Sequence, residues 1–325
     1  MPGNIAEVFG GLILLIWGAD RFVHGAAATA RNLGIAPLMI GLTIVAFATS
    51  SPEILVSIVA AGRGETDLAI GNALGSNIAN IGLVLGTVAL IRPIELRSAT
   101  LRREMPALLA VSLLTVALFL DSHLARIDGF VLLTALVIVI IWLVRLGIRS
   151  SSTDPLQADF EAEIPKDIAM RAAIIWLIVG IIALLFGAEL MVDGAMRIAV
   201  AVGVSEMVIG ITLVALATSL PELAVSLVSA IKGEFGIAIG NIVGSNIFNM
   251  LAVIGVAAVI QPAALESTVL SLHLFVMVAF TLVLFAMTYE YDGRGVITRY
   301  EGFALVAAFL AYDTYVVLQN VRIGH

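Results

Sequence analysis

Long apolar stretches separated by short polar connectors run along almost the whole chain. A helix needs roughly 20 residues to cross about 30 Å of hydrocarbon. Helices are expected rather than strands, because a spanning segment must satisfy its backbone hydrogen bonds internally. The pattern predicts an all-α integral membrane protein with ten transmembrane helices. The ten predicted spans are residues 5–23, 36–61, 68–91, 104–121, 127–148, 172–195, 205–231, 237–261, 268–288 and 297–319.

One connector is longer and more polar than the others. Residues 149–171 read RSSSTDPLQADFEAEIPKDIAMR, an acidic stretch that contains two prolines. It separates a first half, residues 1–148, from a second half, residues 172–325, and each half holds five predicted spans. We therefore predict two five-helix units joined by a linker.

The composition supports a membrane protein and excludes several other classes. Hydrophobic residues make up 61% of the 325 residues and charged residues 13%, whereas a soluble domain carries about 25% charged residues. A soluble or disordered chain would not have this composition. The net charge of −7 without basic clusters argues against a nucleic-acid partner. The absence of cysteine excludes disulfides and thiolate chemistry.

The distribution of Lys and Arg predicts the orientation in the membrane. The connectors after spans 1, 3, 5, 7 and 9, together with the span ends next to them, hold 13 of the 17 basic residues, and the opposite side holds 4. The positive-inside rule then places residues 149–171 in the cytoplasm and both termini outside the cell membrane. Residues 1–20 contain no Lys or Arg, so we interpret the first apolar stretch as a retained span rather than a secretory signal.

The two halves share an internal repeat. Residues 41–86 and 210–255 align without a gap at an offset of 169, with 26 of 46 positions identical. Five spans is an odd number, so the second half is predicted to enter the membrane from the opposite side. Secondary transporters often have such inverted repeats and bind substrate between them, near the midplane. The alternative is that the repeat arose by duplication and serves helix packing alone. Packing alone does not require the polar residues to be kept, whereas this repeat keeps them.

The first repeated motif places a carboxylate in the middle of an apolar span. It reads AFATSSPE at residues 46–53 and ALATSLPE at residues 215–222. Proline removes a backbone donor, so spans 2 and 7 are expected to break there, with the preceding Ser or Thr capping the new helix. Carbonyls such as that of Ala46 would then be unpaired. With the carboxylate four residues after Thr49, they would form an oxygen-rich cage suited to Ca²⁺ and Na⁺.

Glu53 and Glu222 are the residues on which this interpretation depends. A charged group at the centre of a membrane helix costs about 2.5–3.5 kcal/mol on insertion scales. Neither span offers a basic partner, so a bound cation or a proton would have to offset the cost. The alternative is a capping or protonated glutamate with one interhelical hydrogen bond, which explains a symmetric pair less readily than a single residue.

The second repeated motif reads GNALGSNIAN at residues 71–80 and GNIVGSNIFN at residues 240–249. Its serine and last asparagine are expected to face the site in each copy. Its other asparagines could instead be hydrogen-bonding contacts between helices, beside glycines that allow close approach. Polar residues every fourth position share one helix face, and here they are Asn72, Ser76 and Asn80, and Asn241, Ser245 and Asn249.

The chain has no signature of nucleotide use or hydrolysis. It contains no GxxxxGK[ST] loop, and its four histidines show no metal-binding spacing. We therefore expect neither an enzyme nor a cofactor, and no nucleotide partner. An ion gradient would supply the energy for transport.

These residues resemble the α-repeats of the sodium/calcium exchanger family, within the cation/calcium antiporter superfamily and nearest its bacterial and archaeal branch. Both copies of G-x-T-x-V-A-x-A-T-S-x-P-E and of G-N-x-x-G-S-N-I-x-N match. The resemblance implies a ten-helix antiporter, expected to be a monomer, that exchanges cytoplasmic Ca²⁺ for external Na⁺ by alternating access. The site residues it implies are Glu53, Glu222, Thr49, Thr218, Ser50, Ser219, Ser76, Ser245, Asn80 and Asn249, with the carbonyls of Ala46 and Ala215.

One feature departs from the family pattern. Several members carry Asp in one copy where this chain has Asn80 and Asn249. Two ionised glutamates balance one Ca²⁺, two Na⁺ or two protons, which puts the family's exchange of three Na⁺ per Ca²⁺ in doubt. A Ca²⁺/H⁺ exchanger using the same two glutamates is therefore an alternative. A cation channel, which needs no counter-ion, and a structural or sensory membrane protein are two further classes.

Overall fold

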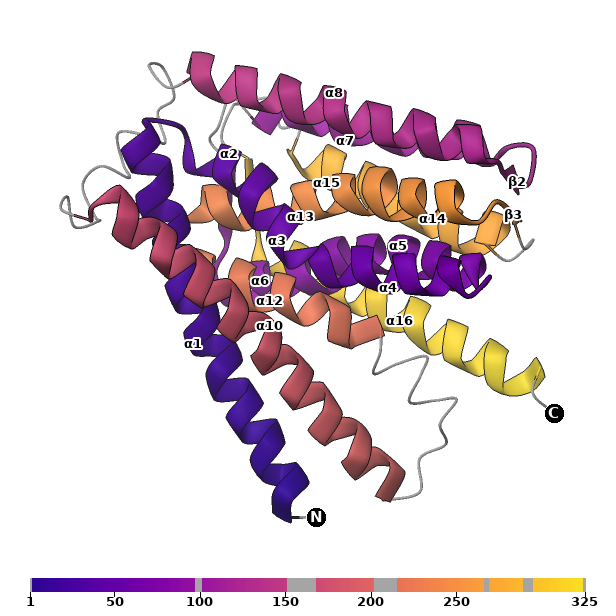
Figure 1. Ribbon diagram of the computed structural model, residues 1–325, viewed down its shortest axis with the longest axis horizontal. Helices are drawn as coiled ribbons and strands as arrows, with labels where there is room; N and C mark the ends of the chain where they lie inside the picture. Colours follow the sequence, from indigo (N-terminus) through magenta and orange to yellow (C-terminus); the bar gives the residue numbers. More distant parts are fainter. Residues whose placement is uncertain are drawn as a thin grey trace.

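The computed structural model describes residues 2–96, 101–150, 168–201, 215–265, 269–288 and 295–323, and most of these are helical (Figure 1). The helices of the first half are α1 (Pro2–Leu33), α2 (Pro37–Ile40), η1 (Gly41–Val45), α3 (Ala46–Thr49), α4 (Ser51–Gly62), α5 (Thr66–Ala79), η2 (Asn80–Leu85), α6 (Gly86–Ile91), α7 (Leu101–Phe119) and α8 (Arg126–Ser150). Those of the second half are α10 (Met170–Ala201), α12 (Ala215–Ile231), α13 (Phe235–Phe248), η4 (Asn249–Val253), α14 (Ile254–Ile260), η5 (Val269–His273), α15 (Leu274–Thr288) and α16 (Arg299–Ile323).

Two short antiparallel ladders join connectors at the ends of the helices. Strand β1 (Ile94–Leu96) pairs with β4 (Gly295–Ile297), and β2 (His123–Leu124) pairs with β3 (Ala263–Ala264). Each ladder ties a connector of the first half to one of the second, so the two halves are interleaved rather than side by side.

Among the described residues, six helices are long and apolar enough to cross a membrane, or seven if the bent pair Pro37–Thr49 and Ser51–Gly62 counts as one span. This agrees with the predicted multi-pass architecture. The count of ten stays a prediction, because the predicted span 205–231 begins within residues 202–214, which lie outside the described residues.

The predicted linker, residues 149–171, falls largely outside the described residues as well. Helix α8 ends at Ser150 and α10 begins at Met170. The division into two five-helix units therefore also remains a prediction.

The second predicted span is broken at its proline motif, as expected. Helix α3 ends at Thr49, and α4 begins at Ser51 with Pro52 in its first turn, bent by 42° from the preceding segment. Pro52 has no backbone N–H to continue the ladder, which explains why the break lies here.

The repeated proline of the second half has a different effect. Helix α12 runs from Ala215 to Ile231 with Pro221 inside it, so the break predicted at this proline is wrong. A proline removes a single ladder bond, and neighbouring helices at membrane depth can hold the chain helical through it. The two copies of the motif share their Thr, Ser, Pro and Glu residues. The difference between a broken and a continuous helix therefore comes from the packing around each copy.

Four segments of the described chain are π-helical, which the sequence analysis did not foresee. Two of them begin at equivalent positions of the repeat, η2 at Asn80 and η4 at Asn249. A third, η1, directly precedes the first repeated motif at Ala46. Single π-helical turns inside α-helices often mark functional sites, and these three adjoin the repeated motifs.

The two helices that carry the second repeated motif form the centre of the molecule. In the most apolar window of Thr66–Ile91, 72% of the residues are buried, and in that of Phe235–Ile260, 89%. The corresponding figures for Arg126–Leu146 and Arg299–Gln319 are both 17%. The polar motif is therefore carried by the best-shielded helices, while α8 and α16 form the apolar periphery.

Helices α1 and α10 form a closely packed pair that extends away from the other helices (Figure 1). Gly18 of α1 lies against the backbone of Leu184, and the equivalent Gly187 of α10 lies against the backbone of Leu15. A Cβ atom at Gly18 would come within 2.8 Å of the Leu184 Cα atom. Glycine is therefore what allows these two helices to approach so closely.

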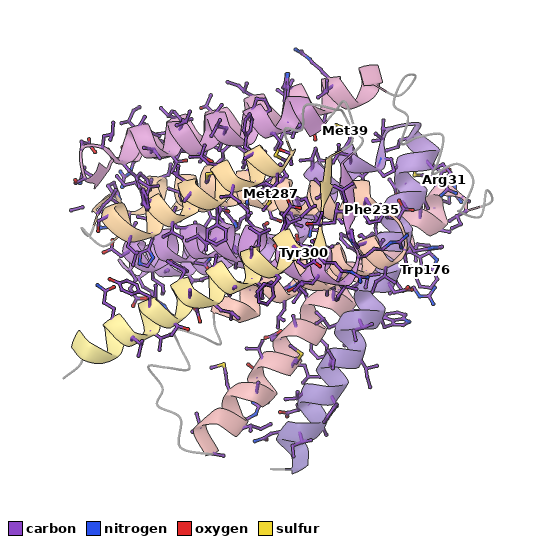
Figure 2. All side chains as sticks on the ribbon, turned by 180° about the vertical axis from the view of Figure 1, so that it is seen from behind. Arg31, Met39, Trp176, Phe235, Met287 and Tyr300 are labelled. Atoms are coloured by element: carbon purple, nitrogen blue, oxygen red, sulfur yellow. The ribbon has the colours of Figure 1, made fainter. Side chains whose placement is uncertain are left out.

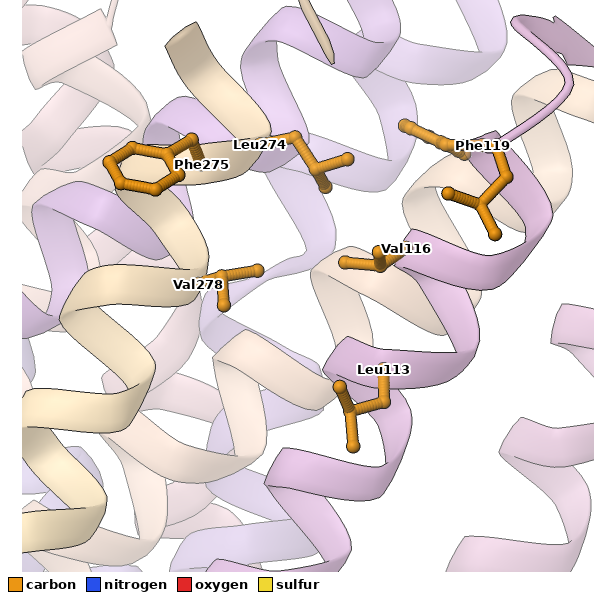
Figure 3. Close-up of a pocket in the computed structure, with 7 residues that line it drawn as sticks. Leu113, Val116, Phe119, Leu274, Phe275 and Val278 are labelled. Atoms are coloured by element: carbon orange, nitrogen blue, oxygen red, sulfur yellow. The ribbon is translucent and has the colours of Figure 1, made fainter. Parts of the chain in front are cut away.

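An apolar pocket of about 440 Å³ lies between α7 and α15 (Figure 3). None of its lining residues belongs to either repeated motif, so it is separate from the polar site described next. The lining residues are Leu113, Val116, Phe119, Leu120, Leu274, Phe275 and Val278.

Candidate functional site

The first motif of one half contacts the second motif of the other. The Thr49 hydroxyl, at the end of α3, donates a hydrogen bond to Asn241 Oδ1 of α13 at 2.9 Å. The same hydroxyl lies 3.4 Å from Ser245 Oγ, one turn further along α13. All three side chains are buried. The candidate site is therefore built between the two repeats.

The carboxylate of Glu222 lies at the same junction. Its Oε1 atom accepts hydrogen bonds from Ser50 Oγ at 3.4 Å and from Ser245 Oγ at 3.5 Å. Ser50 stands at the break between α3 and α4 but makes no side-chain cap to α4. The side-chain cap expected from a Ser or Thr before the proline is therefore absent at Ser50, whose hydroxyl is directed to a carboxylate of the other repeat instead.

The Ala46 carbonyl is not left unpaired, contrary to the expectation from the sequence. It accepts the backbone N–H of Ser50 at 2.9 Å, and the Thr49 hydroxyl oxygen, whose shorter hydrogen bond goes to Asn241, lies 3.3 Å from it. The break at Ser50 comes four residues after Ala46, so the last turn of α3 still satisfies this carbonyl. The equivalent Ala215 begins α12, and its side chain lies outside the described residues.

Glu53 and Glu222 come from opposite repeats and face the same buried region. Glu53, in the first turn of α4, is 1% exposed, and Glu222 is 0% exposed. Glu222 accepts a hydrogen bond from Ser50, the residue that directly precedes α4, and Glu53 lies three residues after Ser50. In each of the two glutamates the Oε2 atom is buried without a hydrogen-bond partner. Burying two such groups together is costly unless something compensates their charge.

Within the described residues nothing in the protein supplies that compensation. No Lys or Arg there forms an ion pair with either glutamate. No group of three or more His, Cys, Asp or Glu side chains is found there either. Among the described residues, the charge of the site therefore comes from two carboxyl groups.

Asparagine oxygens add further unpaired acceptors nearby. Asn80 donates to Asn246 Oδ1 at 3.1 Å, while its own Oδ1 atom is buried without a partner. The Oδ1 atoms of Asn77 and Asn249 are in the same situation. Buried polar atoms are seldom left unpaired in folded proteins. Carboxylate and amide oxygens are ligands that hard cations prefer, so these residues fit a cation as cargo.

Asn241 has a structural role. Its amide donates to the Ser226 hydroxyl at 3.0 Å and to the Glu222 carbonyl at 3.3 Å, while its oxygen accepts from Thr49. These contacts match the interpretation of this asparagine as an interhelical contact. The equivalent Asn72 has a buried amide nitrogen without a partner, so the two copies differ.

The sequence analysis overlooked one pair of serines. Ser226 contacts Asn241, and its repeat equivalent Ser57 donates to the Val253 carbonyl at 2.8 Å. Each serine lies four residues after a glutamate of the site, on the same helix face. Their identity in both copies of the repeat was the signal that could have revealed them.

Most of the predicted site residues are buried side chains of the two motifs. Thr218 and Ser219 are buried next to Glu222 in sequence, and the Ser219 hydroxyl has no hydrogen-bond partner. Ser76 is also buried, but among the described residues no hydrogen bond links it to either glutamate. The hydrogen bonds above bring together Thr49, Ser50, Asn241, Ser245 and Glu222, and separately Asn80 and Asn246.

Known proteins are similar to this chain in sequence and in fold over nearly their full length. The sodium/calcium exchanger protein family matches residues 4–145 and 172–318. The chain is 46% identical over 303 residues to a protein named CaxA from Alkalimonas amylolytica, covering 93% of this chain and 95% of that one. It is 30% identical over 344 residues to the sodium/calcium exchanger MaX1 from Methanosarcina acetivorans, covering 93% and 95%.

The fold agrees with solved structures as well. The sodium-calcium exchanger NCX_Mj soaked with zero Na⁺ and Ca²⁺ has a TM-score of 0.83 and 34% identity, covering 96% of this chain and 98% of that chain. Acidic side chains buried among membrane-spanning helices are typical of ion transporters, and the protein is by class a multi-pass membrane transporter. More specifically, the chain belongs to the sodium/calcium exchanger family, a family of secondary transporters rather than enzymes.

Proposed function

We propose that this protein is a secondary antiporter that exchanges Ca²⁺ for Na⁺ across the membrane by alternating access. One observation carries the proposal: Glu53 and Glu222, one from each repeat, are buried in the same region with unpaired oxygens and no basic partner among the described residues. A cation held between them compensates both charges. The family membership supports Ca²⁺ and Na⁺ as the exchanged ions.

The carboxylates of Glu53 and Glu222 form the central ligands. Hydroxyl and amide oxygens around them complete the coordination, and the chemistry of these donors suits hard cations. Asn80 and Asn249, each at the start of a π-helical segment, present amide oxygens to the middle of the site. The remaining proposed ligands are Thr49, Thr218, Ser50, Ser219, Ser76 and Ser245, with the carbonyls of Ala46 and Ala215.

The ten predicted spans are arranged as two inverted five-helix repeats, residues 1–148 and 172–325, joined by a cytoplasmic linker. Both termini lie outside the cell membrane, and one chain forms the functional unit. Contacts between the motif of one repeat and that of the other support an inverted pair meeting at a shared site.

Two carboxylates limit the charge of the cargo. If both ionise, the site carries −2, which one Ca²⁺ or two Na⁺ neutralises. A third Na⁺ would leave a positive charge, because among the described residues no third acidic side chain joins the two glutamates in a cation-binding group. We therefore propose an exchange of two Na⁺ per Ca²⁺. Two protons would balance the same charge, which keeps Ca²⁺/H⁺ exchange as the second candidate.

The deciding experiment measures radiolabelled Ca²⁺ uptake into proteoliposomes. One set receives an imposed Na⁺ gradient at equal pH on both sides, and the other a pH gradient without Na⁺. We expect the Na⁺ gradient alone to drive uptake. Uptake driven only by the pH gradient would identify the proton as the coupling ion, and uptake with no gradient of either ion would indicate a channel.

A further inference from the structure

Outside the ion site, one ion pair joins helix α1 to the end of α12. Lys232 Nζ lies 2.7 Å from Asp20 Oδ1 and also donates to the Asp20 backbone carbonyl at 3.1 Å. The side chains are 30% and 40% exposed, respectively. Two contacts from one ammonium group to the same residue hold this end of α12 against α1.

The repeat duplicates both charges of this pair. At the offset of 169, Asp20 corresponds to Glu189 of α10, and Lys232 corresponds to Arg63 at the end of α4. Glu189 and Arg63 are both described and exposed, and they form no ion pair with each other. The same pair of opposite charges is thus present twice, once in contact and once apart.

The two acidic residues, Asp20 of α1 and Glu189 of α10, lie on helices that pack against each other as one unit. Helices α1 and α10 are joined by an ion pair between Glu7 and Arg197 and by the Arg21 guanidinium over the Trp176 ring at 4.9 Å. Figure 2 shows Trp176 at the side of the molecule where α1 and α10 adjoin the remaining helices. Because α1 and α10 are packed against each other in this way, we expect a displacement of Asp20 to displace Glu189 as well.

The two basic residues, Lys232 and Arg63, come directly after the helices that carry the glutamates of the ion site. Lys232 directly follows α12, which holds Glu222, and Arg63 directly follows α4, which holds Glu53. The position of Lys232 is further constrained by Arg92, which donates to the Ala230 and Ile231 carbonyls at the end of α12 at 2.9 Å and 2.8 Å. The Asp20–Lys232 pair therefore links the α1–α10 unit to the half of the site on α12, and a Glu189–Arg63 pair would link it to the half on α4.

We propose that Asp20–Lys232 and Glu189–Arg63 are alternating ion pairs, one at each membrane face, that set which face the site opens to. The inference rests on the proposed function, since inverted repeats exchange conformations when a transporter alternates. In the proposed topology Asp20–Lys232 is the cytoplasmic pair and Glu189–Arg63 the external pair. The state described here has the cytoplasmic pair closed and the external pair open.

The simpler explanation is that four charges at the ends of spans are only solvated. That explanation accounts for Glu189 and Arg63 as they stand. It does not account for the two contacts of Lys232 with the carboxylate and the backbone carbonyl of Asp20. Nor does it account for the same acid and base positions recurring in both repeats. Solvation would also leave the transport cycle insensitive to these residues, which an experiment can test.

Cysteine pairs test the alternation directly, because the chain has no native cysteine. The variants are D20C with K232C for the cytoplasmic pair and E189C with R63C for the external pair, each treated with a short thiol-reactive cross-linker in membranes. Changing the Na⁺ and Ca²⁺ concentrations should move the two cross-linking yields in opposite directions. Yields that change together, or an external pair that never links, would overturn the proposal.

The matched control is E7C with R197C, a pair within the α1–α10 unit. Its cross-linking should not respond to ions, because α1 and α10 move together. A response as large as those of the other two pairs would mean that α1 and α10 separate during the cycle, which contradicts the mechanism. This assay does not depend on which counter-ion is transported, so it can fail while the proposed exchange activity stands.

Transport kinetics give a second, sided readout. Lys232→Ala or Asp20→Asn should raise the apparent Ca²⁺ affinity measured at the cytoplasmic face and lower it at the external face, each about two- to fivefold, the effect expected of a partly exposed ion pair. Glu189→Gln should have the reverse effect. The charge exchange D20K with K232D should restore wild-type values, whereas equal changes at both faces would refute the sided role.

Discussion

The Thr49 hydroxyl and the Asn241 amide oxygen, 192 positions apart in the chain, are joined by a buried hydrogen bond of 2.9 Å. The bond links the proline motif of the first repeat to the asparagine motif of the second. Neither repeat can complete the candidate site alone, because its acids and its supporting amides come from both. This explains why each polar residue of the motifs occurs twice.

The two glutamates should be equally indispensable. We expect Glu53→Gln and Glu222→Gln each to abolish Ca²⁺ exchange, because each removes half of the charge that holds the ion. The double variant should be no worse than either single one, since both acids share one ion. Proteoliposome uptake measures this, with the exposed Glu65→Gln as a control that keeps wild-type activity. Partial, additive losses would instead indicate two separate sites.

The hydroxyl of Thr49 should matter for both folding and ion exchange. Thr49→Val leaves Asn241 Oδ1 buried without a donor, which costs about 1–3 kcal/mol. We expect a lower unfolding temperature in detergent and weaker Ca²⁺ uptake. Thr49→Ser keeps the hydroxyl and should retain most of both properties. If valine and serine behave alike, the hydrogen bond contributes little.

The charge of the site predicts how exchange responds to membrane potential. With two carboxylates and a proposed exchange of two Na⁺ per Ca²⁺, the rate should change little when the potential is clamped at different values. Asn80→Asp adds a third acid beside Asn246 and should allow an additional cation. One net charge per cycle is worth about 2.3 kcal/mol per 100 mV, so this variant should become voltage-dependent. A strongly voltage-dependent wild type would contradict the proposed stoichiometry.

The packing of α1 against α10 makes two glycines of the same helix behave differently. Gly18→Ala brings a methyl group against the backbone of Leu184, and overpacking of this kind costs about 1–3 kcal/mol. Gly10 has open space around it, so Gly10→Ala should be neutral or stabilise the helix by up to about 1 kcal/mol. Thermal unfolding of the two variants in detergent should therefore shift in opposite directions or differ clearly in size.

The sequence alone determined the class of protein and the residues of interest. Hydropathy predicted a multi-pass helical membrane protein because water-free surroundings impose long apolar segments with internal hydrogen bonds. The ungapped repeat identified Glu53, Glu222 and the surrounding polar residues. Polar and charged side chains inside a membrane are energetically costly, so their presence at repeated positions indicates a functional role. The break before Pro52 followed from local chemistry, because proline lacks the donor that a continuous helix needs.

Only the tertiary structure decided how those residues are used. The same motif interrupts the helix at Pro52 and is accommodated within α12 at Pro221, because the neighbouring helices determine whether a lost backbone bond is tolerated. The partners of Ser50 and Thr49 lie in the other repeat, where no local periodicity can indicate them. Contacts between distant segments depend on how helices pack, and the chain specifies that packing only as a whole.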